Sequence, residues 1–96
     1  MRQVYLITYD ISDDRRRDQV FRILRGVGDH LQFSVFRCEA SAAELVRLQA
    51  RLHEAINARE DQILFADLGP NDGRGTTAVQ ALGRAYTHPE RHAVIY

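Results

Sequence analysis

The order of predicted elements along the chain indicates a single α+β domain of the ferredoxin-like type. Apolar or alternating segments predict strands at residues 2–9, 30–40 and 62–68, and two amphipathic helices separate them. A chain of 96 residues has room for one hydrophobic core. We therefore expect a β-α-β-β-α-β sandwich with an additional C-terminal strand, forming one domain over residues 1–96.

The first strand and first helix are the clearest elements. Residues 2–9 include a run without alternation, so this strand should be buried on both faces. The helix is expected over residues 13–27, with Ser12 as its N-cap. Its core face is predicted from the i, i+3, i+4, i+7 spacing of four residues, Val20, Ile23, Leu24 and Val27.

The middle of the chain predicts two short strands and a second helix. Between residues 30 and 40 the apolar face changes, which requires a bend or turn, and we place the break near Phe33 and Ser34. Ser41 and Glu44 form a predicted capping box that opens a helix reaching about residue 57. The apolar stripe of this helix consists of Leu45, Leu48, Leu52 and Ile56.

The last third of the chain is less regular. A strand at 62–68 is followed by a loop at 69–75, which is rich in glycine, proline and asparagine. Residues 76–86 fit either a strand or a helix. A turn at 87–91 and a terminal strand at 92–96 complete the chain.

The apolar strands also predict a partner subunit. Two helices cover only one face of a four-stranded sheet, yet residues 4–7 and 63–66 are apolar on both faces. A second copy packed sheet against sheet would cover the open face. The terminal strand at 92–96 would be an exposed edge in a monomer. We therefore expect a homodimer, with residues 76–96 as a tail that packs on the partner subunit.

Composition limits the function classes. The net charge is zero and the pI is about 6.9, which argues against coating of nucleic acid by bulk charge. All 13 basic residues are arginine, which suits phosphate recognition but also fits a GC-rich genome. No apolar run is long enough for a membrane span, no leader pattern opens the chain, and Cys38 is the single cysteine. We expect a cytoplasmic protein.

The stretch from Asp10 to Arg17 contains the highest concentration of charged residues that could bind a ligand or take part in catalysis. Asp10 stands where the first strand ends, and a carboxylate there can bind Mg²⁺ or Mn²⁺ through oxygen. Metal-assisted hydrolysis of a phosphodiester also needs a positive group near the phosphate, which Arg15, Arg16 or Arg17 could supply. The alternative is that Asp10 ends a turn and that these charges form a solvated helix face. The residues alone leave both interpretations open.

Two motifs in the first half of the chain resemble a known family. The first is Tyr9-Asp10-Ile11-x-Asp13-Asp14 followed by Arg16-Arg17, and the second is Gln32-x-Ser34-Val35-Phe36. Together with length and element order, they resemble the smaller of the two universal CRISPR adaptation proteins, the second CRISPR-associated core family. The resemblance covers roughly residues 1–68.

The resemblance implies a homodimer whose metal site, for Mg²⁺ or Mn²⁺, is made by the catalytic Asp10 of both subunits. Supporting or phosphate-binding positions would be Tyr9, Arg16 or Arg17, and Phe36. Many members carry a basic residue shortly before the second motif. Here the nearest basic residue is His30, which the resemblance makes a further supporting or phosphate-binding position.

The resemblance leaves two functions open, both within spacer acquisition in CRISPR antiviral defence. One is a metal-dependent endonuclease acting on RNA or double-stranded DNA. The other is a non-catalytic adaptor that bridges subunits of the CRISPR integrase and holds the DNA to be inserted. A small-molecule regulator is a third class, and no sequence feature marks a ligand pocket for it.

Overall fold

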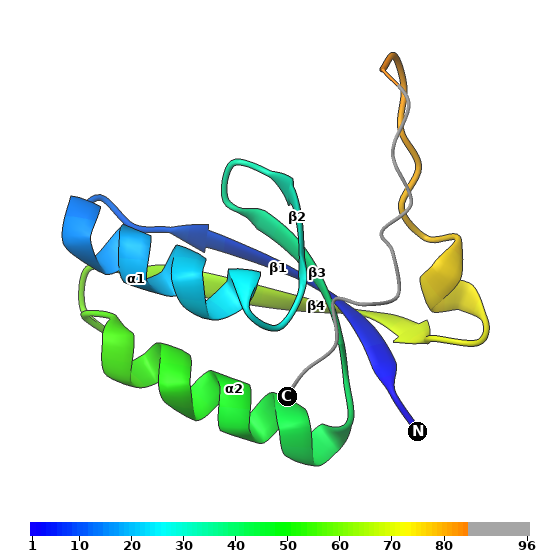
Figure 1. Cartoon of the computed structure of the whole chain (residues 1–96), viewed down its shortest axis with the longest axis horizontal. Helices are drawn as coiled ribbons and strands as arrows, with labels where there is room; N and C mark the ends of the chain where they lie inside the picture. Colours follow the sequence, from blue (N-terminus) through cyan, green and yellow to red (C-terminus); the bar gives the residue numbers. More distant parts are fainter. Residues whose placement is uncertain (85–96) are drawn as a thin grey trace.

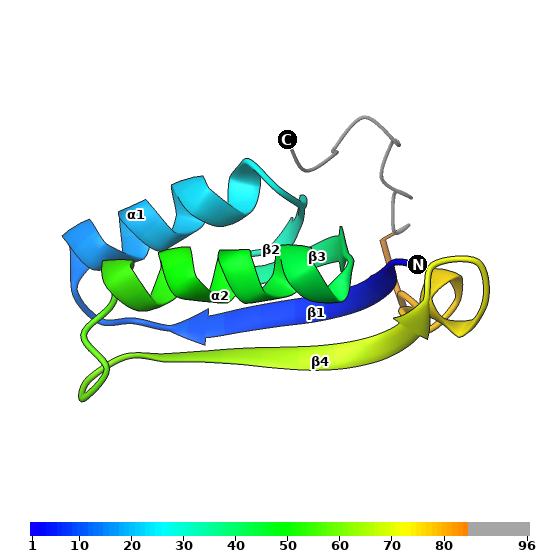
Figure 2. The same cartoon turned by 90° about the horizontal axis from the view of Figure 1, so that it is seen from below.

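The computed structural model describes residues 1–84 and contains one four-stranded antiparallel sheet with the order β2-β3-β1-β4. Both helices lie on the same side of this sheet (Figures 1 and 2). The predicted α+β, ferredoxin-like architecture is confirmed. The elements are β1 (Gln3–Asp10), α1 (Asp14–Arg25), β2 (Asp29–Gln32), β3 (Val35–Ala40), α2 (Ala42–Ala55), β4 (Gln62–Pro70) and a short 3-10 helix, η1 (Arg74–Thr76).

The start of α1 differs from the prediction. Asp13, and not Ser12, is the N-cap, because its carboxylate accepts a hydrogen bond from the backbone N–H of Arg16 at 2.9 Å. Both residue types are good caps, so the sequence alone does not decide between neighbours. The helix ends at Gly26, whose N–H donates to the last carbonyls of α1.

The capping box at the start of α2 is confirmed. The N–H of Ser41 donates to Glu44 Oε1 at 2.8 Å, and the N–H of Glu44 donates to Ser41 Oγ at 3.2 Å. Arg2 also donates two hydrogen bonds to the Glu44 carboxylate. These bonds from Arg2, helped by that from Ser41, lower the pKa of Glu44 to about 2.

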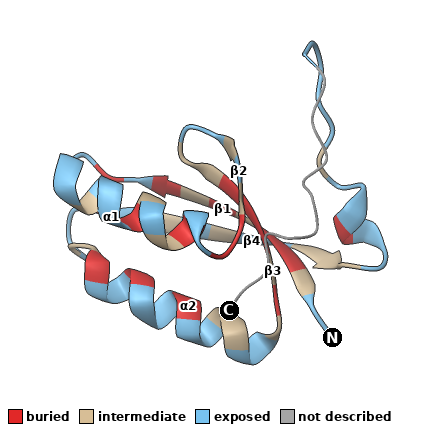
Figure 3. Ribbon diagram, viewed as in Figure 1, coloured by how far each residue is buried: buried red, intermediate tan, exposed pale blue. Residues whose placement is uncertain are grey.

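The core lies between the helices and one face of the sheet (Figure 3). Alternate residues of β1 point into it, and the buried face of β3 supplies Phe36 and Cys38. Burial raises the pKa of the Cys38 thiol to about 12, so Cys38 is packed as a small apolar residue. The predicted helix stripes are buried or half-buried, from Val20 and Leu24 in α1 and from Leu48 and Leu52 in α2, with Ile23, Leu45 and Ile56 beside them.

The opposite face of the sheet is covered only in part. Val4 is fully buried because Gly75 of η1 packs directly on it: a Cβ on Gly75 would come within 2.6 Å of Val4 Cγ2. Farther along, Leu6 lines a groove together with Val79 and Leu82 of the same chain. Leu64 on β4 stays 55% exposed. The chain itself therefore covers one end of a face that we expected a second subunit to cover, and the homodimer stays a prediction.

The described part of the segment after β4 contains η1 and then no helix or strand up to residue 84. The predicted turn at 87–91 and terminal strand at 92–96 lie outside the described residues. Across residues 1–84, neither helix has the length and apolar character that a membrane crossing requires.

Candidate functional site

A cleft of about 600 Å³ opens where β1 ends, where α1 begins and where the chain turns from β2 to β3. The side chains of α1 that line it follow i, i+3, i+4, i+7 spacing and so share one helix face. That face is charged at its start and aromatic at its end. The lining residues are Tyr9, Asp10, Ile11, Asp14, Arg17, Asp18, Phe21, Phe33 and Ser34.

Arg17 is the basic residue of this cleft, and its guanidinium is held in place by its own helix start. Nη1 donates to the carbonyl oxygens of Ile11 at 3.1 Å and Ser12 at 3.3 Å, and Nη2 donates to the Asp14 carboxylate. The Nε–H group has no hydrogen-bond partner among residues 1–84. Arg17 therefore keeps a donor available for a ligand in the cleft.

The three carboxylates of the cleft are not equivalent. Asp14 forms an ion pair with Arg17, and Asp18 forms one with Arg22 at 3.0 Å. Asp10 is exposed, and within the described part of the chain its carboxylate makes no hydrogen bond or ion pair. Pairing neutralises the charges of Asp14 and Asp18, so Asp10 is the acid left to bind something else.

The Asp10 carboxylate suits a hard divalent cation, because Mg²⁺ and Mn²⁺ take oxygen ligands and keep several waters. No group of three or more His, Cys, Asp or Glu side chains in residues 1–84 is arranged to hold a metal. One chain, in its described part, thus offers a single free carboxylate ligand at this position, and the remaining ligands would be water, substrate or a second chain.

Tyr9 lies behind Asp10 and connects the cleft to the core. Its side chain is buried, which raises the pKa of its hydroxyl, and its ring packs 6.3 Å from that of Phe36. The Tyr9 N–H donates to the carbonyl oxygen of Ser34 at 3.1 Å. Tyr9 therefore fixes the β2–β3 turn against the end of β1.

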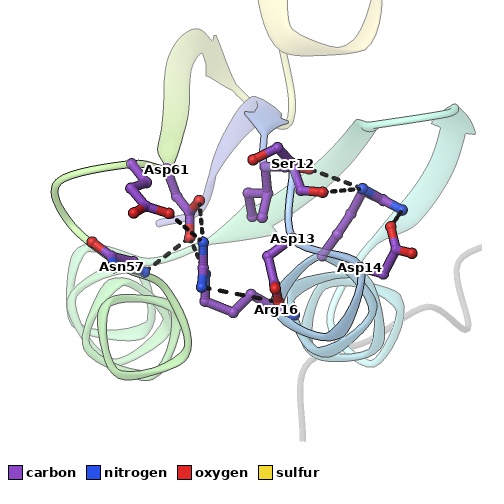
Figure 4. A network of polar contacts seen from close by, with 9 residues as sticks. Ser12, Asp13, Asp14, Arg16, Asn57 and Asp61 are labelled. Atoms are coloured by element: carbon purple, nitrogen blue, oxygen red, sulfur yellow. Dashed lines mark hydrogen bonds and ion pairs between the residues drawn. The ribbon is translucent and has the colours of Figure 1, made fainter.

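Arg16, next to Arg17 in sequence, points toward Asp61 (Figure 4). Its Nε and Nη2 donate to the two carboxylate oxygens of Asp61 at 2.7 and 3.2 Å, and the backbone N–H of Asn57 donates to the same carboxylate at 2.9 Å. The hydrogen bonds from Arg16 lower the pKa of Asp61. The side chain of Asp61 is 0% exposed, so Arg16 serves to neutralise a carboxylate buried between α1 and β4.

His30 and Phe36 do not line this cleft and form an aromatic cluster with Phe21. The His30 ring stacks on Phe36 at 4.8 Å between centroids and meets the edge of Phe21 at 5.0 Å. His30 Nε2 lies 2.9 Å from the carbonyl oxygen of Phe33. His30 is also exposed to solvent, and the phosphate contact that the family resemblance implies at this position stays a prediction.

The structure thus brings together three of the residues singled out from sequence, Tyr9, Asp10 and Arg17, and separates Arg16, His30 and Phe36 from the cleft. Sequence reasoning missed Phe33 and the role of Asp61. The helical spacing of Asp14, Arg17, Asp18 and Phe21 could have marked one wall, whereas no sequence signal marks the exposure of Phe33.

Comparisons with known proteins agree with the motifs. The family model described as "CRISPR associated protein Cas2" matches residues 2–74. A CRISPR-associated endoribonuclease Cas2 of Geobacter sulfurreducens is 34% identical over 99% of this chain and 99% of its own. The crystal structure of Streptococcus pyogenes Cas2 at pH 6.5 superposes with a TM-score of 0.70 and 33% identity, covering 83% of this chain and 99% of the other. A hypothetical protein of Thermus thermophilus superposes with a TM-score of 0.76 and 26% identity, covering 88% and 94%.

Proposed function

The chain belongs to the Cas2 family of CRISPR-associated proteins, and from that premise we propose that it is a metal-dependent endonuclease that acts on RNA or double-stranded DNA during spacer acquisition. The curated relatives carry the name CRISPR-associated endoribonuclease, which supports a nuclease role in CRISPR defence. The observation that carries the proposal is the exposed Asp10 carboxylate, which is unpaired within residues 1–84 and lies in the cleft that Arg17 also lines.

The charge of the cleft supports a cation there. Three aspartates and one arginine line it. Asp14 and Asp18 form ion pairs, whereas the charge of Asp10 is not compensated by any residue in the described range 1–84. A phosphodiester brings a further negative charge, and two like charges in a partly desolvated cleft repel each other. Nucleic acid would therefore enter this cleft together with a divalent cation that separates the phosphate from Asp10.

Bound at Asp10, Mg²⁺ or Mn²⁺ would supply Lewis-acid stabilisation of the phosphate and a water of lowered pKa. The chain's own residues have separate tasks. Asp10 provides carboxylate oxygen as a ligand, and Arg17 can donate Nε–H to a phosphate oxygen while its other contacts keep the guanidinium in place. Tyr9 holds the β2–β3 turn, which forms the far wall of the cleft.

A second copy of the chain would improve the metal site. Alternation along β1 places Asp10 on the same face as Leu6 and Thr8, the face on which Leu64 remains exposed. Two chains packed through this face about a two-fold axis would bring the two Asp10 carboxylates toward each other. Such a homodimer would bury the apolar face that carries Leu64 and would also add the second subunit's Asp10 as a metal ligand.

The alternative function is a non-catalytic adaptor that holds DNA and bridges integrase subunits. Arg15 and Arg25 favour it, because both lie exposed on α1 and form no ion pair with any residue of the described part. Such arginines can bind the phosphate backbone of a duplex without catalysing a reaction on it. An integrase partner belongs to this proposal as well as to the first, since both place the protein in spacer acquisition.

Cleavage with and without metal separates the two functions. Single-stranded RNA and double-stranded DNA are incubated with the protein in Mg²⁺, Mn²⁺ or EDTA, and spacer acquisition is scored in cells that carry wild type or Asp10→Asn. A nuclease cuts one substrate only with metal. An adaptor cuts neither, and Asp10→Asn then supports acquisition as well as wild type does.

A further inference from the structure

The turn between β2 and β3 presents an aromatic ring to solvent at the edge of the cleft. Phe33 is 96% exposed, and it lines the cleft together with Asp10 and Arg17. A single exposed apolar side chain is ordinary on a protein surface. The position of Phe33 is unusual, because the same cleft is lined by the Asp10 carboxylate and the Arg17 Nε–H group, which have no partner in the part of the chain that the structure describes.

The backbone that carries this ring is held on both sides. The carbonyl oxygen of Phe33 lies 2.9 Å from His30 Nε2, and the carbonyl oxygen of the next residue, Ser34, accepts the hydrogen bond from the Tyr9 N–H. The His30 ring is itself packed against Phe36 and Phe21. The position of the Phe33 backbone is thus fixed by the aromatic cluster and by β1, while its ring contacts no other ring described in the structure.

An aromatic ring beside a phosphate-binding position is the arrangement that recognises unpaired nucleotides. Bases that are splayed out of a single strand stack on aromatic side chains while arginines bind the adjacent phosphates. Within a duplex the base faces are covered by neighbouring base pairs, so a phenylalanine can stack on a base there only after the base step is unstacked, which costs free energy. An unpaired base needs no such step, and the ring therefore adds more affinity for a single strand than for an intact duplex.

We propose that Phe33 is a nucleobase-stacking residue that makes the cleft prefer unpaired nucleotides, an inference that rests on the proposed function of the same cleft. A base lies against the Phe33 ring, and the phosphate attached to its nucleotide lies toward Arg17 and Asp10. The occupant is a single strand of RNA, or a single-stranded end of DNA, which presents the same chemistry of an open base face and a phosphate.

The test compares strands with and without bases. Fluorescence anisotropy measures binding of the full chain, in Ca²⁺, to an oligouridylate of about ten nucleotides, to an abasic strand with the same number of phosphates, and to a blunt duplex DNA. We expect Phe33→Ala to weaken binding of the oligouridylate about tenfold and to leave binding of the abasic strand and the duplex unchanged. Phe33→Trp should restore oligouridylate binding. A single-stranded DNA of the same length shows whether the sugar matters.

The matched control is Val46→Ala, which removes a 64% exposed apolar side chain from α2, an element that does not line the cleft. Equal losses for the oligouridylate and the abasic strand in Phe33→Ala would overturn the stacking role. Sedimentation of Phe33→Ala at a lower mass than wild type would also overturn it, because Phe33 would then be a subunit contact.

The outcomes also separate this inference from the proposed function. If Phe33→Ala binds oligouridylate as wild type does, while Asp10→Asn abolishes metal-dependent cleavage, the stacking role fails and the nuclease stands. If wild type binds none of the probes, both proposals fail together.

Discussion

The guanidinium of Arg16 donates to both carboxylate oxygens of Asp61, with Nε at 2.7 Å and Nη2 at 3.2 Å. This pair joins the first turn of α1 to the residue that precedes β4. It assigns different tasks to two adjacent arginines, because Arg16 is used to neutralise a buried carboxylate while Arg17 faces the cleft.

Arg16→Ala should lower the Tm by several degrees near neutral pH, because it leaves the Asp61 carboxylate buried without its positive partner. The control is Arg15→Ala, which removes an exposed arginine from the same turn. Thermal unfolding followed by circular dichroism measures both. Equal Tm values for the two variants would contradict a structural role for Arg16.

The same pair predicts a pH dependence. The pKa of folded Asp61 is lowered, so its contribution to stability is present above the pKa of an unfolded aspartate, about 3.9, and is lost as the pH falls below it. The Tm difference between wild type and Arg16→Ala should therefore be largest near neutral pH and should shrink as the pH falls and Asp61 becomes protonated, first in the variant, which lacks the positive partner. A difference that grows in acid would count against the pair.

Arg17→Ala should weaken binding of nucleic acid and reduce its dependence on salt. Removal of one phosphate contact per chain lowers the slope of log K against log salt by about 0.7 to 0.9. Binding titrations over a salt series measure the slope, with Arg16→Ala as the matched arginine variant. Our assignment requires an unchanged slope in Arg16→Ala, and an unchanged slope in Arg17→Ala would contradict it.

Gly75→Ala should loosen the segment that covers one end of the open face. A Cβ at this position would lie 2.6 Å from Val4 Cγ2 and 2.8 Å from the carbonyl oxygens of Gly69 and Pro70. Overpacking of this kind costs about 1–3 kcal/mol, which denaturant unfolding measures. Faster amide exchange around η1 should accompany the loss, and Gly73→Ala, at a position with open space around it, should show neither effect.

The sequence predicted the fold well because the spacing of apolar and capping residues determines most of the helices and strands. The strand break near Phe33 and Ser34, the capping box at Ser41 and the stripes of both helices all appear where expected. Where two neighbouring residues had similar propensities, the prediction was wrong by one position, as with Ser12 and Asp13 at the start of α1.

The candidate site was predicted in part. Asp10 and Arg17 came from the motif, and helical spacing places Arg17 on one face with Asp14, Asp18 and Phe21. The partner of Arg16 could not be predicted, because Asp61 lies 45 residues away in sequence. The burial of Arg37 could not be predicted from sequence either. Alternation along β3 places Arg37 on the face opposite the core, yet it is 3% exposed and forms an ion pair with Glu39. Such contacts depend on tertiary packing, which periodicity does not encode.

The central claim is that the Asp10 carboxylate holds the metal on which cleavage depends. The most direct measurement is the rate of cleavage of single-stranded RNA and double-stranded DNA by Asp10→Asn in Mg²⁺ or Mn²⁺, beside Asp72→Asn, which changes an exposed aspartate beyond β4. We predict that Asp10→Asn falls to the rate measured in EDTA while its Tm and sedimentation match those of wild type, and that Asp72→Asn cuts normally. Cleavage by Asp10→Asn at the wild-type rate would contradict the claim.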